Sequence, residues 1–191
     1  VEGSDAIIDW AEANAGGDKP GLCPQGLSDE DLSDEIGKTE ARLDKRAGIN
    51  VRRFIYSHVM PDKAHYVKPM LFANTGFVHR LAGNLMWPAC KKLIVKGYKI
   101  NAGSAGEARA VLEEEFAWLE GRLAGQDHLV GNTFTRADLT AASLLAPFAR
   151  PDEMPLYRDA IFPDDLMATF AEWSDRPVMQ WVRRIYRDYR N

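Results

Sequence analysis

Cysteine is scarce in this chain of 191 residues, which contains only Cys23 and Cys90. The two lie far apart and form no C-x-x-C pair, so we expect neither a disulfide scaffold nor a zinc site. Scarce, unpaired cysteines are typical of a reducing compartment, and we therefore predict a cytoplasmic location. Cys90 stands in an apolar stretch and is interpreted as a small buried hydrophobic residue.

Long apolar runs and a basic excess are also missing. No uninterrupted apolar stretch approaches the roughly 20 residues that cross a bilayer. The net charge is −4, whereas a nucleic-acid-binding domain is expected to be strongly basic. We therefore expect no membrane partner and no nucleic-acid partner.

The sequence also lacks the motifs that would carry several kinds of chemistry. It contains no G-x-S-x-G, no P-loop and no Gly-rich dinucleotide fingerprint. No two histidines are spaced at i, i+4, so no metal site is expected. The four histidines are His58, His65, His79 and His128.

What the chain does have is helical periodicity along nearly its whole length, and period-2 alternation is hard to find. This pattern predicts an all-α protein. The clearest stripe has intervals of four, three and four residues, and it consists of Leu112, Phe116, Leu119 and Leu123. Ser104 and Glu107 precede it with the spacing of a capping box, and Gly125 is expected to end this helix.

A second helix is predicted to begin at Thr135. The Thr135 hydroxyl can accept from the amide of Asp138, and the Asp138 carboxylate can accept from the amide of Thr135. This capping role accounts for Asp138, which is therefore not interpreted as a catalytic acid or base. The helix is expected in the middle of the bundle, where it would bury Leu139, Ala142, Leu145 and Phe148.

Further helices are predicted on both sides of these two. Ser28 is expected to open a helical stretch whose apolar spacing continues to Val59, and Pro61 ends it. Residues 61–103 are expected to form two or three helices, one of them kinked or ended near Pro88. The last two helices are predicted to begin near Pro163 and at Pro177, because proline suits the first turn.

Four segments together resemble glutathione transferases. They occur in the expected order along the chain: Ser4-Asp5-Ala6-Ile7, Gly21-Leu22-Cys23-Pro24, the stretch from Leu119 to Leu139, and Arg176-Pro177-Val178-Met179-Gln180-Trp181. The third is similar to the family's Gly-x-x-Phe-(Ser/Thr)-x-Ala-Asp element. The resemblance implies an all-α glutathione transferase C-terminal-type helical bundle with a remnant of a thioredoxin-like domain. Residues 1–17 would be that remnant, 18–27 a linker and 28–191 the helical domain.

The resemblance also implies a function for the parent protein, which would conjugate glutathione, as co-substrate, to a small electrophile. Ser4 and Asp5 are the candidate glutathione-binding residues, because a helix N-terminus presents free amides to a carboxylate. Gly3 stands where the family usually has Glu or Gln. The family's thiolate-stabilising residue would precede Val1, so we expect the chain alone to be inactive. The catalytic residue stays unknown.

Arg52 and Tyr56 are the candidates for the electrophile site, because they lie on the segment that resembles the family's cleft-lining helix. Phe54, between them, is interpreted as a core residue. The arginines of the last helix are interpreted as a solvated face. The resemblance further implies a homodimer. An alternative function is a non-catalytic interaction module, as in translation-associated complexes or metaxin-like proteins.

Overall fold

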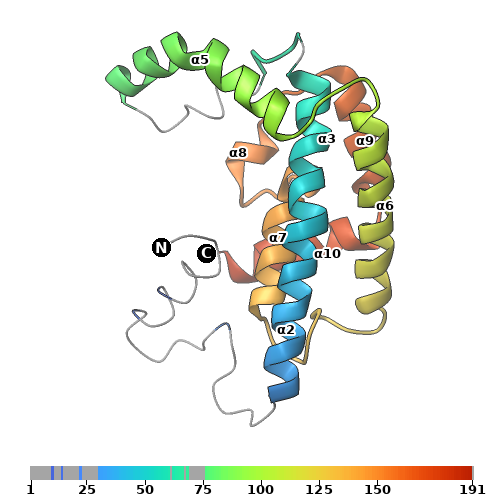
Figure 1. The fold of residues 1–191 in the computed structure, drawn as a ribbon. Helices are drawn as coiled ribbons and strands as arrows, with labels where there is room; N and C mark the ends of the chain where they lie inside the picture. The colour runs from blue at the N-terminus through green and yellow to red at the C-terminus, as the bar shows by residue number, and fades with distance from the viewer. Residues whose placement is uncertain are drawn as a thin grey trace.

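The computed structural model describes residues 10, 14, 22, 30–60, 62–66, 68 and 76–190. Within these ranges there is no β-strand, and the prediction of an all-α fold is confirmed. Of the expected thioredoxin-like remnant, only Trp10 and Asn14 are described. The elements in chain order are α2 (Glu30–Leu43), the π-helical turn η1 (Asp44–Gly48), α3 (Ile49–Val59), α5 (Phe77–Gly97), α6 (Ser104–Arg122), α7 (Arg136–Ala149), α8 (Pro155–Arg158), α9 (Asp164–Ser174) and α10 (Pro177–Tyr189) (Figure 1).

The first described helical segment runs without a break from α2 through η1 to α3. Helical backbone ends at Val59, as the sequence predicts, while Ser28 lies outside the described residues. The π-helical turn was not foreseen from the sequence. It buries Ala47 and Gly48, and a Cβ added at Gly48 would lie 3.5 Å from the Leu144 side chain of α7. This distance is an ordinary van der Waals contact, so the segment packs against α7 at this point and a small side chain would also fit.

Helix α7 is the central element of the bundle. It contacts α2, α9 and α10, and ten of its 14 residues are buried. Ala142, Leu145 and Phe148 are among them, whereas Leu139 is half-buried. The prediction of a buried central helix is confirmed.

Aromatic rings form the centre of the core where α3, α6, α7 and α9 meet. Phe116 and Phe148 each make edge-on contacts with Trp173, both at 5.1 Å between ring centroids. Phe54 lies 5.2 Å from the same indole, which confirms its interpretation as a core residue. Edge-to-face pairs of this kind add to the free energy gained by burial.

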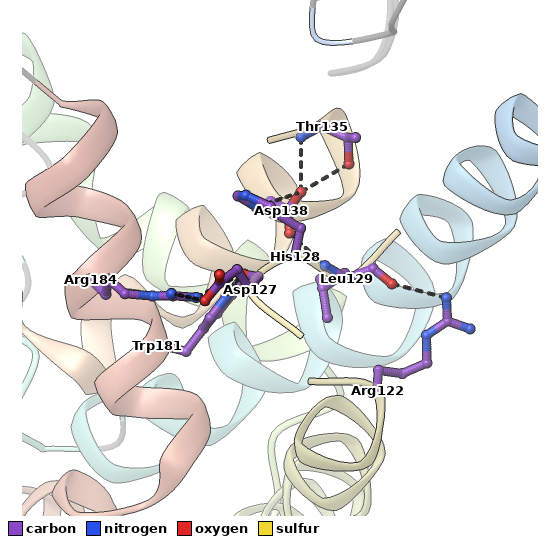
Figure 2. Close-up of polar contacts among 8 residues, drawn as sticks. All are labelled: Arg122, Asp127, His128, Leu129, Thr135, Asp138, Trp181 and Arg184. Atoms are coloured by element: carbon purple, nitrogen blue, oxygen red, sulfur yellow. Dashed lines mark hydrogen bonds and ion pairs between the residues drawn. The ribbon is translucent and has the colours of Figure 1, made fainter. Parts of the chain in front are cut away.

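The N-terminus of α7 carries the capping box that the sequence predicts. The fully buried Asp138 carboxylate accepts from the Thr135 amide at 2.8 Å and from the Thr135 hydroxyl at 3.0 Å. Its other oxygen accepts from the Leu129 amide at 2.8 Å (Figure 2). Asp138 thus satisfies backbone groups on both the helix and the preceding loop.

The loop before α7 is also attached to α6 and α10. Arg122 donates to the Leu129 carbonyl at 3.0 Å, and the Trp181 indole donates to the Asp127 carbonyl at 2.8 Å. The Arg184 guanidinium donates to the same carbonyl at 2.7 Å and pairs with the Asp127 carboxylate (Figure 2). This loop therefore joins three helices through polar contacts.

A buried carboxylate joins the first helical segment to α6. The Glu115 side chain is fully buried and pairs with Arg42 at 2.8 Å and with Arg46. Both guanidinium groups reach partly into solvent. Two cations facing one buried anion offset the cost of removing that anion from water.

The start of α6 differs from the prediction. Ser104 and Glu107 do not form a capping box: the Glu107 amide bonds to the Gly103 carbonyl, and the Glu107 carboxylate pairs with Arg53. Asn101 instead accepts from the Gly103 amide at 2.9 Å. The buried Ser104 hydroxyl accepts from the Asn101 amide, so the serine stabilises the loop and not the helix end.

Between residues 61 and 103 the structure describes residues 62–66, 68 and 76–103, so the expected number of helices there is not tested. Helix α5 continues through Pro88 and does not end there. Leu81 and Leu85, from the predicted stripe, are exposed. Cys90 is half-buried on this helix, not fully buried as expected, and Cys23 lies outside the described residues.

The prediction that the arginines of the last helix form a solvated face is only partly right. Arg187 and Arg190 are exposed, as a solvated face requires. Arg183, however, donates to the Ala149 carbonyl at 3.2 Å and to the Ser174 carbonyl at 2.6 Å. These are the last residues of α7 and α9, so this arginine satisfies carbonyl groups that a helix end leaves unpaired.

The Asp138 contacts generate a stability prediction. In the native chain each oxygen of the Asp138 carboxylate accepts from one backbone amide. Asp138→Asn replaces one of these oxygens with an NH2 group, which cannot accept from the amide that it faces. We expect the free energy of unfolding to fall by about 2–4 kcal/mol in urea titrations. Asp164→Asn, on an exposed first-turn aspartate of α9, is the matched control and should cost about 0.5 kcal/mol or less. Equal stability of the two variants would contradict the role of Asp138.

Candidate ligand cavity between α3, α7 and α8

An open cavity of about 250 Å³ lies between α3, α7 and the segment that contains α8. Most of its surface is apolar, and no acidic side chain is among the described residues that line it. Its lining residues are Gly48, Val51, Arg52, Ile55, Tyr56, Ser143, Leu144, Pro147, Leu156, Tyr157 and Phe162. The cavity is therefore suited to an apolar molecule that carries a polar or anionic group.

The structure brings the two predicted electrophile-site residues together in this cavity. Arg52 and Tyr56 are four residues apart on α3, so they lie on the same side of the helix. Arg52 is exposed at the mouth, whereas Tyr56 is half-buried and packs edge-on against Tyr98 at 5.3 Å between ring centroids. The cavity thus combines one cation with a partly buried phenol.

One wall of the cavity depends on Arg150, which sequence reasoning missed. This residue ends α7 in the left-handed conformation with φ of 49°. Its guanidinium donates to the carbonyls of Tyr157 at 3.0 Å and Ala160 at 2.9 Å. Arg150 therefore holds α8 and the following residues over the end of α7.

Tyr157 is a second phenol that the sequence did not reveal. It stands in a four-residue helix with no periodic pattern around it, so no local signal marks it. Only the fold of the segment after α7 brings it to the cavity.

Burial raises the pKa of both phenols. Loss of water raises the pKa of Tyr56 above its ordinary value, and Tyr98 raises it further while Arg52 opposes the shift. Burial also raises the pKa of Tyr157, again against the opposing effect of Arg52. Both tyrosines are therefore neutral hydrogen-bond donors at physiological pH.

The candidate glutathione-binding residues, Ser4 and Asp5, lie outside the described residues. Leu22, from the predicted linker, is described, and its carbonyl accepts from the Arg136 amide at 3.2 Å. This contact places one linker residue at the first turn of α7.

Among the described residues, no cluster of His, Cys, Asp and Glu could hold a metal ion. The search of the same residues for a helix long and apolar enough to span a membrane also found none.

Comparison with known families supports the sequence resemblance. Residues 85–176 match the family model described as "Glutathione S-transferase, C-terminal domain". The matched region starts within α5, includes all of α6 and α7, and ends just before α10. No curated protein and no solved structure matches the chain.

The all-helical fold and this match define the class of the protein, which is a helical domain of the glutathione transferase C-terminal type. Residues 85–176 therefore correspond to the C-terminal domain of glutathione S-transferases.

The raised pKa values generate a prediction for alkaline solution. In the unfolded chain a tyrosine ionises near 10.0, but in the fold Tyr56 and Tyr157 keep their protons to higher pH. The folded state therefore binds more protons, and its stability falls as pH rises above 10.0 through the folded-state pKa values.

Replacing both tyrosines with phenylalanine should make this alkaline loss less steep in urea titrations. Tyr66→Phe, outside the cavity, is the control and should leave the slope unchanged. The pKa assignment is wrong if the double variant keeps the slope of the original chain.

Proposed function

We propose that the chain is the C-terminal part of a glutathione transferase-like protein and that the cavity between α3, α7 and α8 binds the electrophilic co-substrate. The observation that carries this proposal is the joint position of Arg52, Tyr56 and Tyr157 around an apolar floor. The match of residues 85–176 to the glutathione S-transferase C-terminal domain supports glutathione as the other substrate. Ser4 and Asp5 stay the proposed contacts of glutathione itself.

The chemistry of the cavity indicates which electrophiles it would accept. An aromatic or aliphatic body would lie on Val51, Ile55 and Leu144. A carboxylate or nitro group would be oriented by the Arg52 cation and by the neutral phenols of Tyr56 and Tyr157. Because no acidic side chain is among the described residues that line the cavity, an anionic group meets no repelling negative charge from them.

We assign the cavity to the electrophile and place the activation of glutathione elsewhere in the parent protein. Transfer requires the thiolate, which the family stabilises with a Ser, Tyr or Cys of the thioredoxin-like half. The neutral phenols of the cavity would serve the electrophile in this proposal. We therefore propose that the 191-residue chain has no transferase activity on its own and that it acts as a homodimer within the parent.

Binding of a matched pair of ligands tests the cavity. Nitrobenzoate and nitrobenzamide have similar size, and only the first is charged. Arg52→Gln should weaken nitrobenzoate about fivefold, since the arginine is exposed and its charge is screened, and should leave nitrobenzamide unchanged. Titration calorimetry gives both dissociation constants, with Arg187→Gln on the exposed face of α10 as the control.

If neither ligand binds, the cavity is not an electrophile site, and the non-catalytic interaction module becomes the better hypothesis. Equal weakening by the Arg52 and Arg187 variants would show that only overall charge matters.

Turnover is the second test. The purified 191-residue chain, mixed with glutathione and an electrophilic aryl halide, should show no rate above the uncatalysed reaction. Robust turnover by this chain would overturn the proposal that its thiolate-stabilising residue lies elsewhere in the parent. Retention of the parent on immobilised glutathione would separate loss of glutathione binding from loss of chemistry.

A further inference from the structure

One long segment of the chain carries charge of only one sign. Residues 63–106 contain seven Lys or Arg residues and no Asp or Glu, although the whole chain has a net charge of −4. Helix α5 forms the middle of this segment. A basic segment within an acidic protein indicates a surface that meets negative charge.

Helix α5 also exposes large apolar side chains. The exposed fractions are 62% for Leu81, 84% for Leu85, 60% for Met86 and 70% for Leu93. Leu81 and Leu85 are four residues apart, as are Ala82 and Met86, so the members of each pair lie next to each other on successive turns. We call this solvent-exposed side of α5 its outer face. Apolar side chains gathered in this way mark a surface that contacts a partner or a lipid.

The other side of α5 faces the bundle. Trp87, Ile94 and Val95 are half-buried and pack against the core. The N-terminal part of α5 projects beyond α3 at one end of the bundle (Figure 1). The exposed leucines are therefore not needed to fill the core of this fold.

Exposed lysines follow the apolar side chains at the C-terminal end of the helix. Lys92 and Lys96 lie on α5, and Lys99 lies just after it. Within the described part of the chain, none of these three has a carboxylate at ion-pair distance. Their charges remain available to an anionic surface.

We propose that the outer face of α5 binds the surface of an anionic lipid bilayer. Leu81, Leu85 and Met86 would enter the boundary between head groups and acyl chains, while Lys92, Lys96 and Lys99 would contact lipid phosphates. The long lysine stems allow this, because they lie along apolar surface while the ammonium groups stay in water. This proposal departs from the expectation of no membrane partner, which rested on the lack of a long apolar run. Binding to the bilayer surface needs no helix that crosses the membrane.

A bilayer fits these observations better than a second copy of the chain. Two α5 faces in contact would bring basic segments together without an acidic residue between positions 63 and 106 to compensate. A soluble polyanion would satisfy the lysines but would leave the leucines in water. The proposal is independent of the electrophile cavity, whose lining includes no residue of α5.

Vesicle flotation with the purified 191-residue chain tests the proposal. The two probes are vesicles of phosphatidylcholine alone and vesicles of an equimolar mixture with phosphatidylserine. The chain should bind the mixed vesicles and not the neutral ones. Binding should be lost in about 1 M salt, where charges are screened within about 3 Å.

Two variants separate the roles of charge and apolar contact. Lys92→Glu with Lys96→Glu should weaken partition into mixed vesicles by at least roughly 30-fold, since each base near such a surface contributes about fivefold. Leu81→Ser with Leu85→Ser should weaken it by a similar factor. The control is Lys38→Glu with Lys45→Glu, which makes the same change in net charge at exposed sites before α3 and should keep near-original binding.

Several results would overturn the proposal. One is equal binding to neutral and anionic vesicles, and another is binding to neither. An effect of the lysine variants without an effect of the leucine variants would show that Leu81 and Leu85 do not enter the bilayer. A chain that binds no vesicles but sediments as a dimer, and that loses this dimer in the leucine variants, would identify a second copy of the chain as the partner of α5. Because all substituted residues are exposed, circular dichroism should show unchanged helix content in every variant.

Discussion

The fold depends on one buried carboxylate, that of Asp138. It accepts from two backbone amides and one hydroxyl, which belong to Leu129 in the loop before α7 and to Thr135, the N-cap residue of that helix. A buried carboxylate without such donors would cost several kcal/mol, so its position fixes where the loop ends and α7 begins. Because α7 contacts α2, α9 and α10, the register of the central helix determines how three others pack.

The cavity follows from this arrangement. Helix α7 supplies Ser143, Leu144 and Pro147 to its floor, and α3 supplies Arg52 and Tyr56 across from them. The π-helical turn η1 ends at Gly48, which faces the Leu144 side chain in the interior of α7. Arg150, which follows the last residue of α7, holds the segment that contributes Tyr157. The site therefore depends on the interior of the central helix and on the residue that ends it.

The protein has two surfaces of different chemistry. The cavity side offers one cation and neutral phenols around a small apolar floor, which suits a small molecule. Helix α5 offers exposed leucines and several lysines without acidic neighbours, which suits an extended anionic surface. Helix α5 contributes no residue to the cavity lining, but Tyr98 at its C-terminal end packs against Tyr56 of the cavity at 5.3 Å between ring centroids. The two surfaces therefore meet at this pair of rings.

The local sequence pattern was sufficient to predict some structural features and not others. The sequence by itself determined the all-α class, the buried stripe of α6 and the capping box at Thr135, because each depends on side chains three or four residues apart. It failed at Ser104, where the competing partners Asn101 and Arg53 come from outside the helix. Only the tertiary structure decided the pairing of Glu115 with Arg42, the cavity position of Tyr157 and the exposed leucines of α5. Those features depend on contacts between distant segments, and helical periodicity does not specify which neighbour covers a face.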